Sequence, residues 1–298
     1  MLEFVNCNYC GQDDTELILE LSPFQIVRCK VCGLIYGNPR LSWADSKRIY
    51  TDQYYISNDP VAGGYEDYIR DESVLVKTFK RRLADIERYV KGGRLLDLGC
   101  ALGFFMKVAH MSGWDVTGLD ICPYACSYVK ERFGFYVICS ELKDDSFSEG
   151  IFDIVTMWDY IEHVPDPLNE LKIAYKILRP NGLLAVTTPN VKSWIAKITG
   201  KRWLGFKCPK EHIFYFSPKS ITMMLEKAGF TVLCVKSVGK YFRLDVAKTR
   251  IKDYSKLIGK FFEFSINTLS VLDRSIYVNE GGTMAVFAKK VNTPEFYH

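Results

Sequence analysis

The sequence predicts an α/β protein whose mostly parallel sheet is covered by helices on both faces. Three observations lead to this class. After Gly92 and Gly93, short apolar runs alternate with stretches of helical periodicity. A turn of small residues joins the first apolar run to the first helical stretch, and an acidic residue ends the second apolar run. Alternation of this kind is typical of βα units, in which crossover helices bury both faces of a sheet.

The composition is that of a folded protein with no membrane-spanning segment. Of 298 residues, 48% are hydrophobic and 14% aromatic, which is enough for a substantial core. The chain has no run of about 18 uncharged apolar residues. The N-terminus lacks the basic and apolar segments of a signal peptide. We therefore expect a cytoplasmic protein whose ten cysteines are metal ligands or buried thiols.

The first 40 residues are predicted to form a zinc ribbon. They contain the pattern C-x2-C-x18-C-x2-C, a spacing typical of four-cysteine zinc sites. Between the two pairs, ELILELSPFQIVRC has the pattern of a hairpin. Four thiolates complete the tetrahedral shell of Zn²⁺ and leave no position for water or substrate, so this zinc is expected to be structural. The predicted ligands are Cys7, Cys10, Cys29 and Cys32.

Residues 41–91 are expected to form a linker with N-terminal helices. The first part of this segment is rich in tyrosine and shows no single period. Leu75, Leu83 and Ile86 then recur at helical spacing, which predicts a helix over about Ser73–Tyr89.

Residues 92–298 are predicted to form one domain built around seven strands. Strands and helices alternate first, and a further helix then precedes two strands that are expected to pair as an antiparallel hairpin at the sheet edge. A helical insertion over about 240–279 separates these last two strands. The predicted strands cover RLLDLG, DVTGLD, FYVIC, FDIVTMWD, GLLAVTTP, TVLCVKSVG and GTMAVFAKK.

The turn LLDLGCALGFF, where the first strand of this domain meets its first helix, is the predicted nucleotide site. Small residues at Gly99, Ala101 and Gly103 let the backbone approach a ligand, and the helix N-terminus offers free N–H groups. Asp120 ends the next strand, 23 residues after Asp97. A carboxylate in that place can bind both hydroxyls of a ribose.

The same turn distinguishes between two nucleotide cofactors. The pyrophosphate of a dinucleotide favours G-x-G-x-x-G, but Ala101 and Phe104 occupy the second and third glycine positions. Asp97, two residues before Gly99, would repel a pyrophosphate and favour the ammonium group of an amino acid. The pattern D-x-G-x-A-x-G therefore indicates S-adenosylmethionine.

From about Arg94 to Lys290 the chain resembles the class I S-adenosylmethionine-dependent methyltransferases. LLDLGCALG is similar to the first motif of that family, with Ala101 in place of its middle glycine, and GLDI is similar to the second. FDIVTMWDYIEHVPDP, LRPNGLLAVTTPN and EHIFYFSPKSITMMLEKAGF are similar to later segments. The resemblance implies a Rossmann-like seven-stranded methyltransferase sheet. It also implies that the cofactor is bound by Asp97, Gly99, Cys100, Ala101, Gly103, Asp120, Ile121, Glu141, Leu142 and Trp158.

The stretch DYIEHVPDP follows the fourth strand, at the edge where ligands bind in open parallel sheets. Asp159, Glu162 and His163 have the i, i+3, i+4 spacing that lets side chains point one way in a helical turn. Three roles are open: capping of the helix after Asp166, a base or substrate ligand at His163, or a Mg²⁺ site. The metal role rests on similarity to the acid-x-x-Glu-His pattern of ubiquinone-pathway O-methyltransferases, with Asp159 in place of a glutamate. His212, in a late loop, is the second candidate catalytic histidine.

Positive charge is concentrated in one segment. Residues 192–260 carry a net charge of +12, whereas the preceding 191 residues carry −7. Within that segment, KSWIAKITGKRWLGFKCPK interleaves basic and aromatic residues and should border the substrate pocket. A small phosphorylated substrate, such as a nucleotide-linked sugar, fits better than nucleic acid, which the acidic remainder would repel. The insertion is expected to be a lid or dimer helix, or else a peripheral contact with an anionic membrane.

The sequence thus predicts an enzyme that transfers a methyl group from S-adenosylmethionine to O or C of a small metabolite. Together with its zinc ribbon, the chain resembles bacterial methyltransferases of sugar, polysaccharide and natural-product pathways. Three alternatives stay open: an RNA methyltransferase, a metal-assisted O-methyltransferase like those of the ubiquinone pathway, and a non-catalytic module that binds the cofactor and a partner protein.

Overall fold

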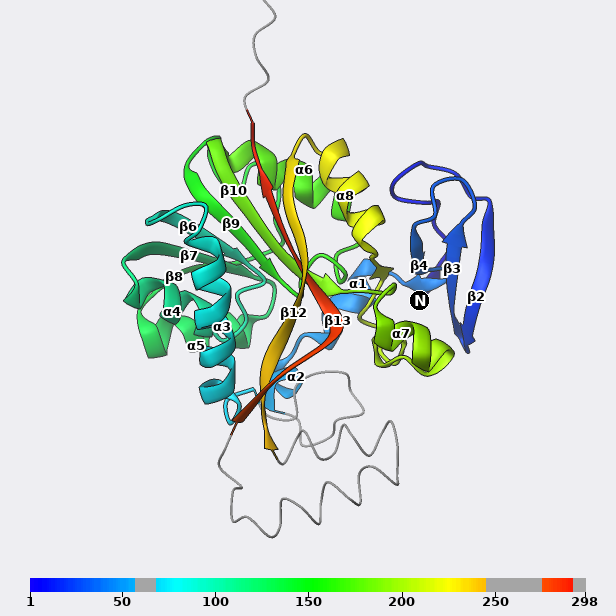
Figure 1. Cartoon of the computed structure of the whole chain (residues 1–298), viewed down its shortest axis with the longest axis horizontal. Helices are drawn as coiled ribbons and strands as arrows, with labels where there is room; N and C mark the ends of the chain where they lie inside the picture. The colour runs from blue at the N-terminus through cyan, green and yellow to red at the C-terminus, as the bar shows by residue number, and fades with distance from the viewer. Residues whose placement is uncertain (57–67, 245–274, 292–298) are drawn as a thin grey trace, which may run out of the picture.

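A seven-stranded sheet forms the centre of the protein (Figure 1). The structure is a computed structural model, and it describes residues 1–56, 68–244 and 275–291. The strand order is β12-β13-β10-β9-β6-β7-β8, and all neighbours are parallel except for the two pairs that involve β13. The predicted sheet and its edge hairpin are therefore confirmed. The strands are β6 (Gly93–Leu98), β7 (Trp114–Asp120), β8 (Tyr136–Cys139), β9 (Phe152–Trp158), β10 (Leu178–Pro189), β12 (Thr231–Arg243) and β13 (Ser275–Lys289).

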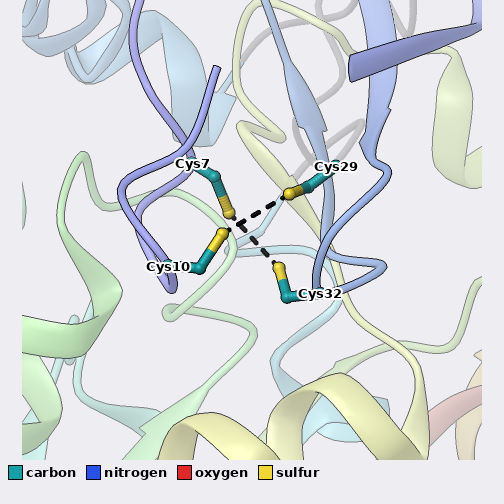
Figure 2. Close-up of side chains that lie close together, drawn as sticks. All are labelled: Cys7, Cys10, Cys29 and Cys32. Atoms are coloured by element: carbon teal, nitrogen blue, oxygen red, sulfur yellow. Dashed lines mark hydrogen bonds between the residues drawn. The ribbon is translucent and has the colours of Figure 1, made fainter. Parts of the chain in front are cut away.

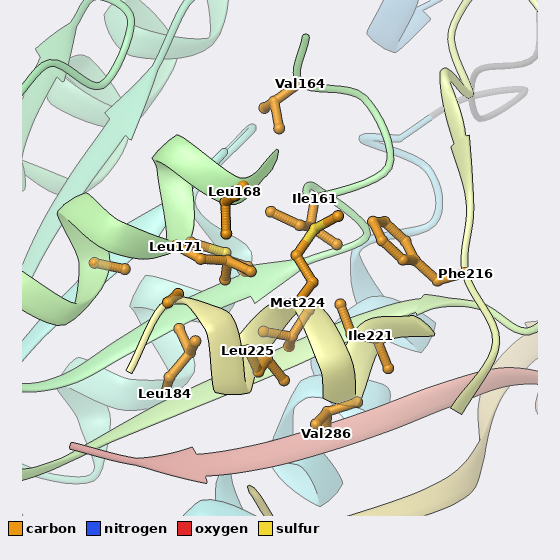
Figure 3. Packing of buried hydrophobic residues seen from close by; sticks show 14 of the residues in the cluster. Ile161, Val164, Leu168, Leu171, Leu184, Phe216, Ile221, Met224, Leu225 and Val286 are labelled. Atoms are coloured by element: carbon orange, nitrogen blue, oxygen red, sulfur yellow. The ribbon is translucent and has the colours of Figure 1, made fainter. Parts of the chain in front are cut away.

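Helices cover both faces of this sheet because successive strand residues point to opposite sides. Leu95 packs with α3 (Glu72–Ile86), α4 (Phe104–Met111) and α5 (Pro123–Phe133), whereas its neighbour Leu96 belongs to the opposite core. That opposite core contains α6 (Pro167–Ile177) and α8 (Pro218–Lys227). Figure 3 shows how side chains from these two helices interlock with those of the strands. Two apolar layers on one buried sheet are what continuous apolar strands require.

Local signals explain where α6 and α8 begin. The Asp166 carboxylate accepts a hydrogen bond from the Asn169 N–H at 3.0 Å and caps α6, with Pro167 in the first turn. Ser217 caps α8 in the same way. The capping role considered for Glu162 and His163 is thus filled by Asp166.

The N-terminal cysteine unit adds a second, smaller sheet with the order β11-β4-β3-β2. The predicted hairpin is confirmed, since β2 (Thr15–Leu21) pairs antiparallel with β3 (Phe24–Cys29). The fourth strand was not predicted: β11 (Phe214–Tyr215) lies much later in the chain, after β10, and pairs with β4 (Ile35–Gly37). A further pair joins β1 (Leu2–Glu3) to β5 (Arg40–Leu41).

Short helices follow the cysteine unit and border the site. They are α1 (Trp43–Ser46), a 3₁₀ turn over Lys47–Ile49, and α2 (Asp52–Ile56). The longer helix expected over Ser73–Tyr89 is confirmed as α3, with ends that differ by one and three residues. After β10 come α7 (Trp194–Thr199) and two 3₁₀ turns, Gly200–Arg202 and Leu204–Phe206.

The two ends of the predicted helical insertion differ from the prediction. Residues 240–243 continue β12 and residues 275–279 belong to β13, because the ladder between these strands extends from Thr231↔Lys289 to Arg243↔Ser275. The apolar residues of the insertion were expected to form one helical stripe from Leu244 to Phe261. All of that stripe after Leu244 lies outside the described residues, so its role as lid, dimer helix or membrane contact stays a prediction. Among the described residues, no helix is both long and apolar enough to cross a bilayer.

Candidate active site

A cavity of about 1010 Å³ opens at the carboxyl ends of β6, β7 and β9, where ligands bind in open α/β sheets. Its volume lies at the upper end of the range for ligand pockets, roughly 300–1,000 Å³. The cavity brings together all but one of the predicted site residues outside the ribbon. Those that line it are Asp97, Gly99, Cys100, Ala101, Asp120, Ile121, Glu141, Leu142, Trp158, His163 and His212.

Gly103 is the exception. It precedes α4 with φ of 73°, and a Cβ atom there would lie 2.8 Å from a Val129 methyl group. The absence of a side chain therefore permits α4 and α5 to pack closely, and Gly103 does not line the cavity. This is the packing role that a third glycine has in glycine-rich nucleotide turns.

The glycine turn is tight at two positions. A Cβ atom on Gly99 would lie 2.5 Å from the Tyr160 ring, so only glycine fits. Ala101 has φ of 48°, a left-handed conformation that is costly for a residue with a Cβ atom. Its N–H donates to the Asp120 carboxylate at 2.9 Å, and this bond holds the turn in place. The turn therefore accommodates the alanine, but with a strained backbone.

Because of this strain, Ala101→Gly is expected to raise the free energy of unfolding by about 0.5–1 kcal/mol. The relief of about 1–2 kcal/mol exceeds the unfolded-state entropy that glycine adds, about 0.4–1 kcal/mol. Denaturant unfolding of the two proteins measures the difference. The matched control is Ala109→Gly in α4, which should lose about 1 kcal/mol or more because glycine disfavours helix. A loss of stability in Ala101→Gly would contradict the strain.

Two buried carboxyl groups flank the turn. Asp97 accepts a hydrogen bond from the Thr156 hydroxyl at 2.7 Å, and burial raises its pKa to about 7. Asp120 accepts from two backbone N–H groups, those of Ala101 and Cys122, each at 2.9 Å. Burial raises the pKa of Asp120 as well, and these backbone bonds oppose the increase. Both acids are held by the fold and face the cavity.

The remaining predicted cofactor residues surround the rest of this end of the cavity. Glu141 makes an ion pair with Lys47, which ties the loop after β8 to the short helices of the N-terminal half. Leu142 is buried, and the Trp158 ring lies edge-on to Phe105, with 5.0 Å between ring centroids. The Trp158 Nε1 is buried without a hydrogen-bond partner among the described residues, so a ligand could satisfy it.

His163 and His212 meet at the other end of the cavity, with 4.9 Å between ring centroids. His163 Nδ1 lies 3.1 Å from the Glu211 carbonyl, and His212 Nδ1 lies 3.2 Å from the Gly205 carbonyl. A carbonyl can only accept, so each Nδ1 carries the proton and each Nε2 keeps its lone pair. Burial lowers the pKa of both, that of His163 to about 3, so both rings are neutral at pH 7.

Glu162 is fully buried beside the two histidines. Neither of its carboxyl oxygens has a hydrogen-bond partner among the described residues. Burial raises its pKa well above the usual range, and the nearby Thr188 hydroxyl opposes this without good hydrogen-bond geometry. A buried carboxyl group without a hydrogen-bond partner costs free energy, which points to a ligand as its missing partner. Ligand atoms of Glu162, His163 and His212 lie within 4.8 Å of one another.

The predicted Mg²⁺ ligand set of Asp159, Glu162 and His163 is wrong in its first member. Asp159 follows β9 with φ of 50°, and its carboxylate is not among the ligand atoms that converge with those of Glu162 and His163. Its carboxylate accepts from Thr187 at 2.9 Å and makes an ion pair with Lys240 on β12. The Lys240 charge and these hydrogen bonds lower the pKa of Asp159 to about 2 despite its burial. In the structure, the third side chain of this group is that of His212 and not that of Asp159.

Sequence reasoning missed three residues of this end of the cavity. Tyr50 places its hydroxyl 3.2 Å from His163 Nδ1. Glu211, whose carboxyl accepts from Tyr54, has a pKa raised to about 7 by burial. Lys240 belonged to the predicted insertion. Since these residues come from separate segments, only the folded chain reveals that they are neighbours.

The four predicted cysteine ligands converge, as Figure 2 shows. Cys7 Sγ lies 3.4 Å from Cys32 Sγ, and Cys10 Sγ lies 3.5 Å from Cys29 Sγ. Tetrahedral zinc with bonds of about 2.3 Å requires sulfur separations of about 3.8 Å. The cluster is therefore compatible with a zinc ribbon after a shift of a few tenths of an ångström.

The basic segment contributes Ile195 and its later part to the cavity. Trp203, Leu204, Gly205, Lys207 and Cys208 line it, so the segment does border the cavity. The exposed cations Lys192, Lys197, Lys201 and Arg202 do not.

Comparisons with known proteins agree with this geometry. A family model described as "Methyltransferase domain" matches residues 68–235. Ubiquinone biosynthesis O-methyltransferases of Coxiella burnetii and Idiomarina loihiensis are 26% and 27% identical to the chain. Each alignment covers 53% of this chain, and 72% and 70% of the respective relative.

Solved structures show the same fold. A SAM-dependent methyltransferase from Archaeoglobus fulgidus matches with a TM-score of 0.52 and 20% identity, over 75% of this chain and 99% of that one. A Thermotoga maritima methyltransferase, titled a possible histamine N-methyltransferase, gives a TM-score of 0.50 and 21% identity, over 75% and 94%. The chain belongs to the S-adenosylmethionine-dependent methyltransferase family.

Proposed function

We propose that the enzyme methylates a hydroxyl group of a small molecule bound between the glycine turn and the pair His163 and His212. One observation carries this proposal: three polar groups without a hydrogen-bond partner among the described residues converge beside the cavity. They are the Nε2 atoms of the two neutral imidazoles, which can accept a hydrogen bond, and the buried carboxyl group of Glu162. An acceptor hydroxyl supplies the donor that this arrangement lacks.

The cofactor would occupy the other end of the cavity. We propose that Asp120 binds the ribose hydroxyls, and that Ile121, Glu141 and Leu142 surround the adenine. Asp97 would face the ammonium group of the methionine part. The backbone of Gly99, which lines the cavity without a side chain, fits this role, as does the unpaired Trp158 Nε1. When bound, S-adenosylmethionine supplies an activated methyl group on a sulfonium.

The protein's part in the reaction is alignment and proton transfer. The residues of the cavity would hold the acceptor hydroxyl in line with the methyl group, and the hydroxyl proton must go to a base within hydrogen-bond reach. His163 Nε2 is the proposed base, and the Glu211 carbonyl keeps its ring in the required tautomer. The Glu162 carboxyl, which lies beside the ring and has no partner among the described residues, could accept a hydrogen bond from the imidazolium that forms.

The charge of the cavity narrows the acceptor class. Ten carboxyl side chains line it against four cationic ones, and two of those four, Lys240 and Arg243, pair with Asp159 and Asp71. Such a lining favours an uncharged or cationic acceptor over a phosphorylated one. Of the other two cations, Arg82 is buried and donates to the Gly239 carbonyl, and Lys207 is exposed, so a nucleotide-linked sugar would have to place its phosphates near one of these.

Labelling identifies the acceptor. The purified full-length chain is incubated with methyl-labelled S-adenosylmethionine and with fractionated metabolites, nucleotide sugars and RNA. We expect label in a small molecule, as an O-methyl ether. Label in RNA would support the RNA methyltransferase alternative, and label on carbon or nitrogen would overturn O-methylation.

The raised pKa of Asp97 predicts how cofactor binding depends on pH. If Asp97 contacts an ammonium group, only its ionised form binds well, so S-adenosylhomocysteine affinity should rise as pH increases toward about 7 and then level off. The slope should reach at most about tenfold per pH unit for one ionisation. Calorimetric titration between pH 5 and 8 measures it. In Asp97→Asn the affinity should be lower and flat, and a slope that persists there would remove Asp97 from this role.

A second candidate function is metal-assisted O-methylation. Two imidazoles and one carboxylate are a ligand set typical of divalent transition metals, and both rings have the Nδ1–H to carbonyl bond common in metal-binding histidines. The relatives named ubiquinone biosynthesis O-methyltransferases add support. Glu162, His163 and His212 would hold the ion, which would lower the pKa of the acceptor hydroxyl.

Metal content separates the two functions. With zinc proposed at the four cysteines, the metal-assisted enzyme should bind a second equivalent of Co²⁺, and His212→Ala should lose that equivalent. Asp159→Asn is the matched control and should keep it, because Asp159 lies outside the ligand set. Elemental analysis after dialysis counts the ions. One equivalent in every variant, with full activity, would exclude metal assistance.

A further inference from the structure

We infer that the N-terminal cysteine unit, residues 1–42, positions the two cavity histidines. The unit itself forms no part of the cavity wall, whose lining residues begin at Trp43. It acts instead through the acceptor loop, defined here as residues 203–216, which carries His212 and the carbonyl that orients His163. The inference depends on the proposed function only in treating this end of the cavity as the acceptor end.

The first connection is the shared sheet. Phe214 and Tyr215 of the acceptor loop pair with Tyr36 and Ile35 of β4, only a few residues after Cys32. Beside this pairing, the Gly37 N–H donates to the Ile213 carbonyl at 2.8 Å. Phe214 and Tyr215 therefore form an edge strand of the cysteine unit, and within residues 1–56, 68–244 and 275–291 they pair with no other strand.

From there the connection continues to the histidines. The Glu162 carbonyl accepts from the N–H groups of Ile213 and Phe214, at 2.8 and 3.1 Å. His163 Nδ1 bonds the Glu211 carbonyl at 3.1 Å. Two residues of the DYIEHVPDP stretch thus depend on backbone groups that the cysteine unit holds.

A second set of hydrogen bonds joins the cysteine unit to the other end of the DYIEHVPDP stretch. The Asn8 side chain, between Cys7 and Cys10, donates to the Asp166 carboxylate at 2.8 Å and accepts from the Leu168 N–H at 3.3 Å. Arg40, which is 8% exposed, donates to the Pro165 carbonyl at 3.1 Å. Residues 160–168 are therefore clamped from both sides by one small unit.

The unit also has little core of its own. Cys7, Cys29, Leu34 and Tyr36 belong to the apolar cluster that contains Ile161, Val164, Phe214 and Phe216. Figure 3 shows part of this cluster, with Ile161, Val164 and Phe216 around α6 and α8. Segments of about 40 residues rarely fold without a metal or disulfides, and for structural zinc sites metal binding is folding energy. Loss of the metal should therefore release the acceptor loop.

Loss of the metal should leave the cofactor end of the cavity unchanged. In the part of the chain that the structure describes, no hydrogen bond joins residues 1–42 to the glycine turn or to β7. Positioning by the cysteine unit is thus expected to be selective: the acceptor end changes and the cofactor end does not.

The test uses Cys10→Ala in the full-length chain, with Cys139→Ala, an exposed cysteine on β8, as the matched control. We expect amides of residues 211–216 to exchange with deuterium at least about tenfold faster in Cys10→Ala, while residues 95–105 keep their protection. Diethyl pyrocarbonate should modify His163 and His212 several-fold faster, with the exposed His110 as internal reference. Binding of S-adenosylhomocysteine should stay within about threefold.

If Cys10→Ala does not fold, Gly37→Pro decides, because it keeps all four cysteines and removes only the N–H that donates to Ile213. It should retain its zinc and its affinity for S-adenosylhomocysteine, yet show faster exchange at 211–216. Unchanged exchange and histidine reactivity in a folded variant would overturn the inference. Neither readout requires methyl transfer, so the inference can fail while the proposed function stands, and the reverse.

Discussion

Replacing Asp120 with alanine is expected to weaken the binding of S-adenosylmethionine by about 100-fold or more. Its carboxylate holds the N–H groups of Ala101 and Cys122, each at 2.9 Å, and so fixes both the glycine turn and the start of α5. Bonds to charged groups contribute roughly 1.5–3 kcal/mol each, and about 1.4 kcal/mol corresponds to tenfold in affinity. Loss of the proposed ribose contacts adds to the loss of the turn.

Calorimetric titration with S-adenosylhomocysteine measures this effect. Asp115→Ala is the matched control, because Asp115 lies on the same strand but its side chain is 74% exposed and pairs only loosely with Arg94. Its affinity should match that of the parent within about twofold, since exposed pairs contribute little. An affinity for Asp120→Ala within threefold of the parent would mean that the cofactor does not use this carboxylate.

The features that could be predicted from the sequence are those that local chemistry specifies. The seven strands follow from apolar runs, the start of α8 from Ser217 and Pro218, and the cysteine unit from its spacing. The glycine turn was also predictable, because a tight approach requires small residues wherever it occurs. Each of these signals lies within about 30 residues of chain, so the folded protein is not needed to find them.

The sequence could not predict which side chains share the site, because contacts with distant segments of the chain determine this. Asp159 does not join Glu162 and His163, because its carboxylate is bound by Thr187 and by Lys240, 81 residues later. His212 joins the site because β11 pairs with β4, and a two-residue strand has no period that a sequence could show. The i, i+3, i+4 spacing assumed a helical turn that positive φ at Asp159 interrupts.

The second large effect is expected at His163. His163→Ala should lower kcat/KM for the acceptor by about 10²–10⁴-fold, the usual contribution of a general base, while S-adenosylhomocysteine affinity stays within about threefold. Because burial lowers the pKa of His163 to about 3, the ring stays neutral above that value. The pH–rate profile should therefore lack the decline near pH 6.5 that an ordinary histidine base would cause.

His163→Asn separates a base from a structural residue. Asparagine places an N–H where Nδ1 lies and can keep the bond to the Glu211 carbonyl, but it has no counterpart of Nε2. If His163 only holds the loop, Asn should restore most of the activity that Ala loses; if it takes the proton, Asn should be as inactive as Ala. His212→Ala adds a further criterion, since residues that act as a unit give a double variant no worse than the poorer single one. If the activity losses of the two single variants add fully in the double variant, the imidazoles have separate tasks. One then takes the proton and the other binds the substrate.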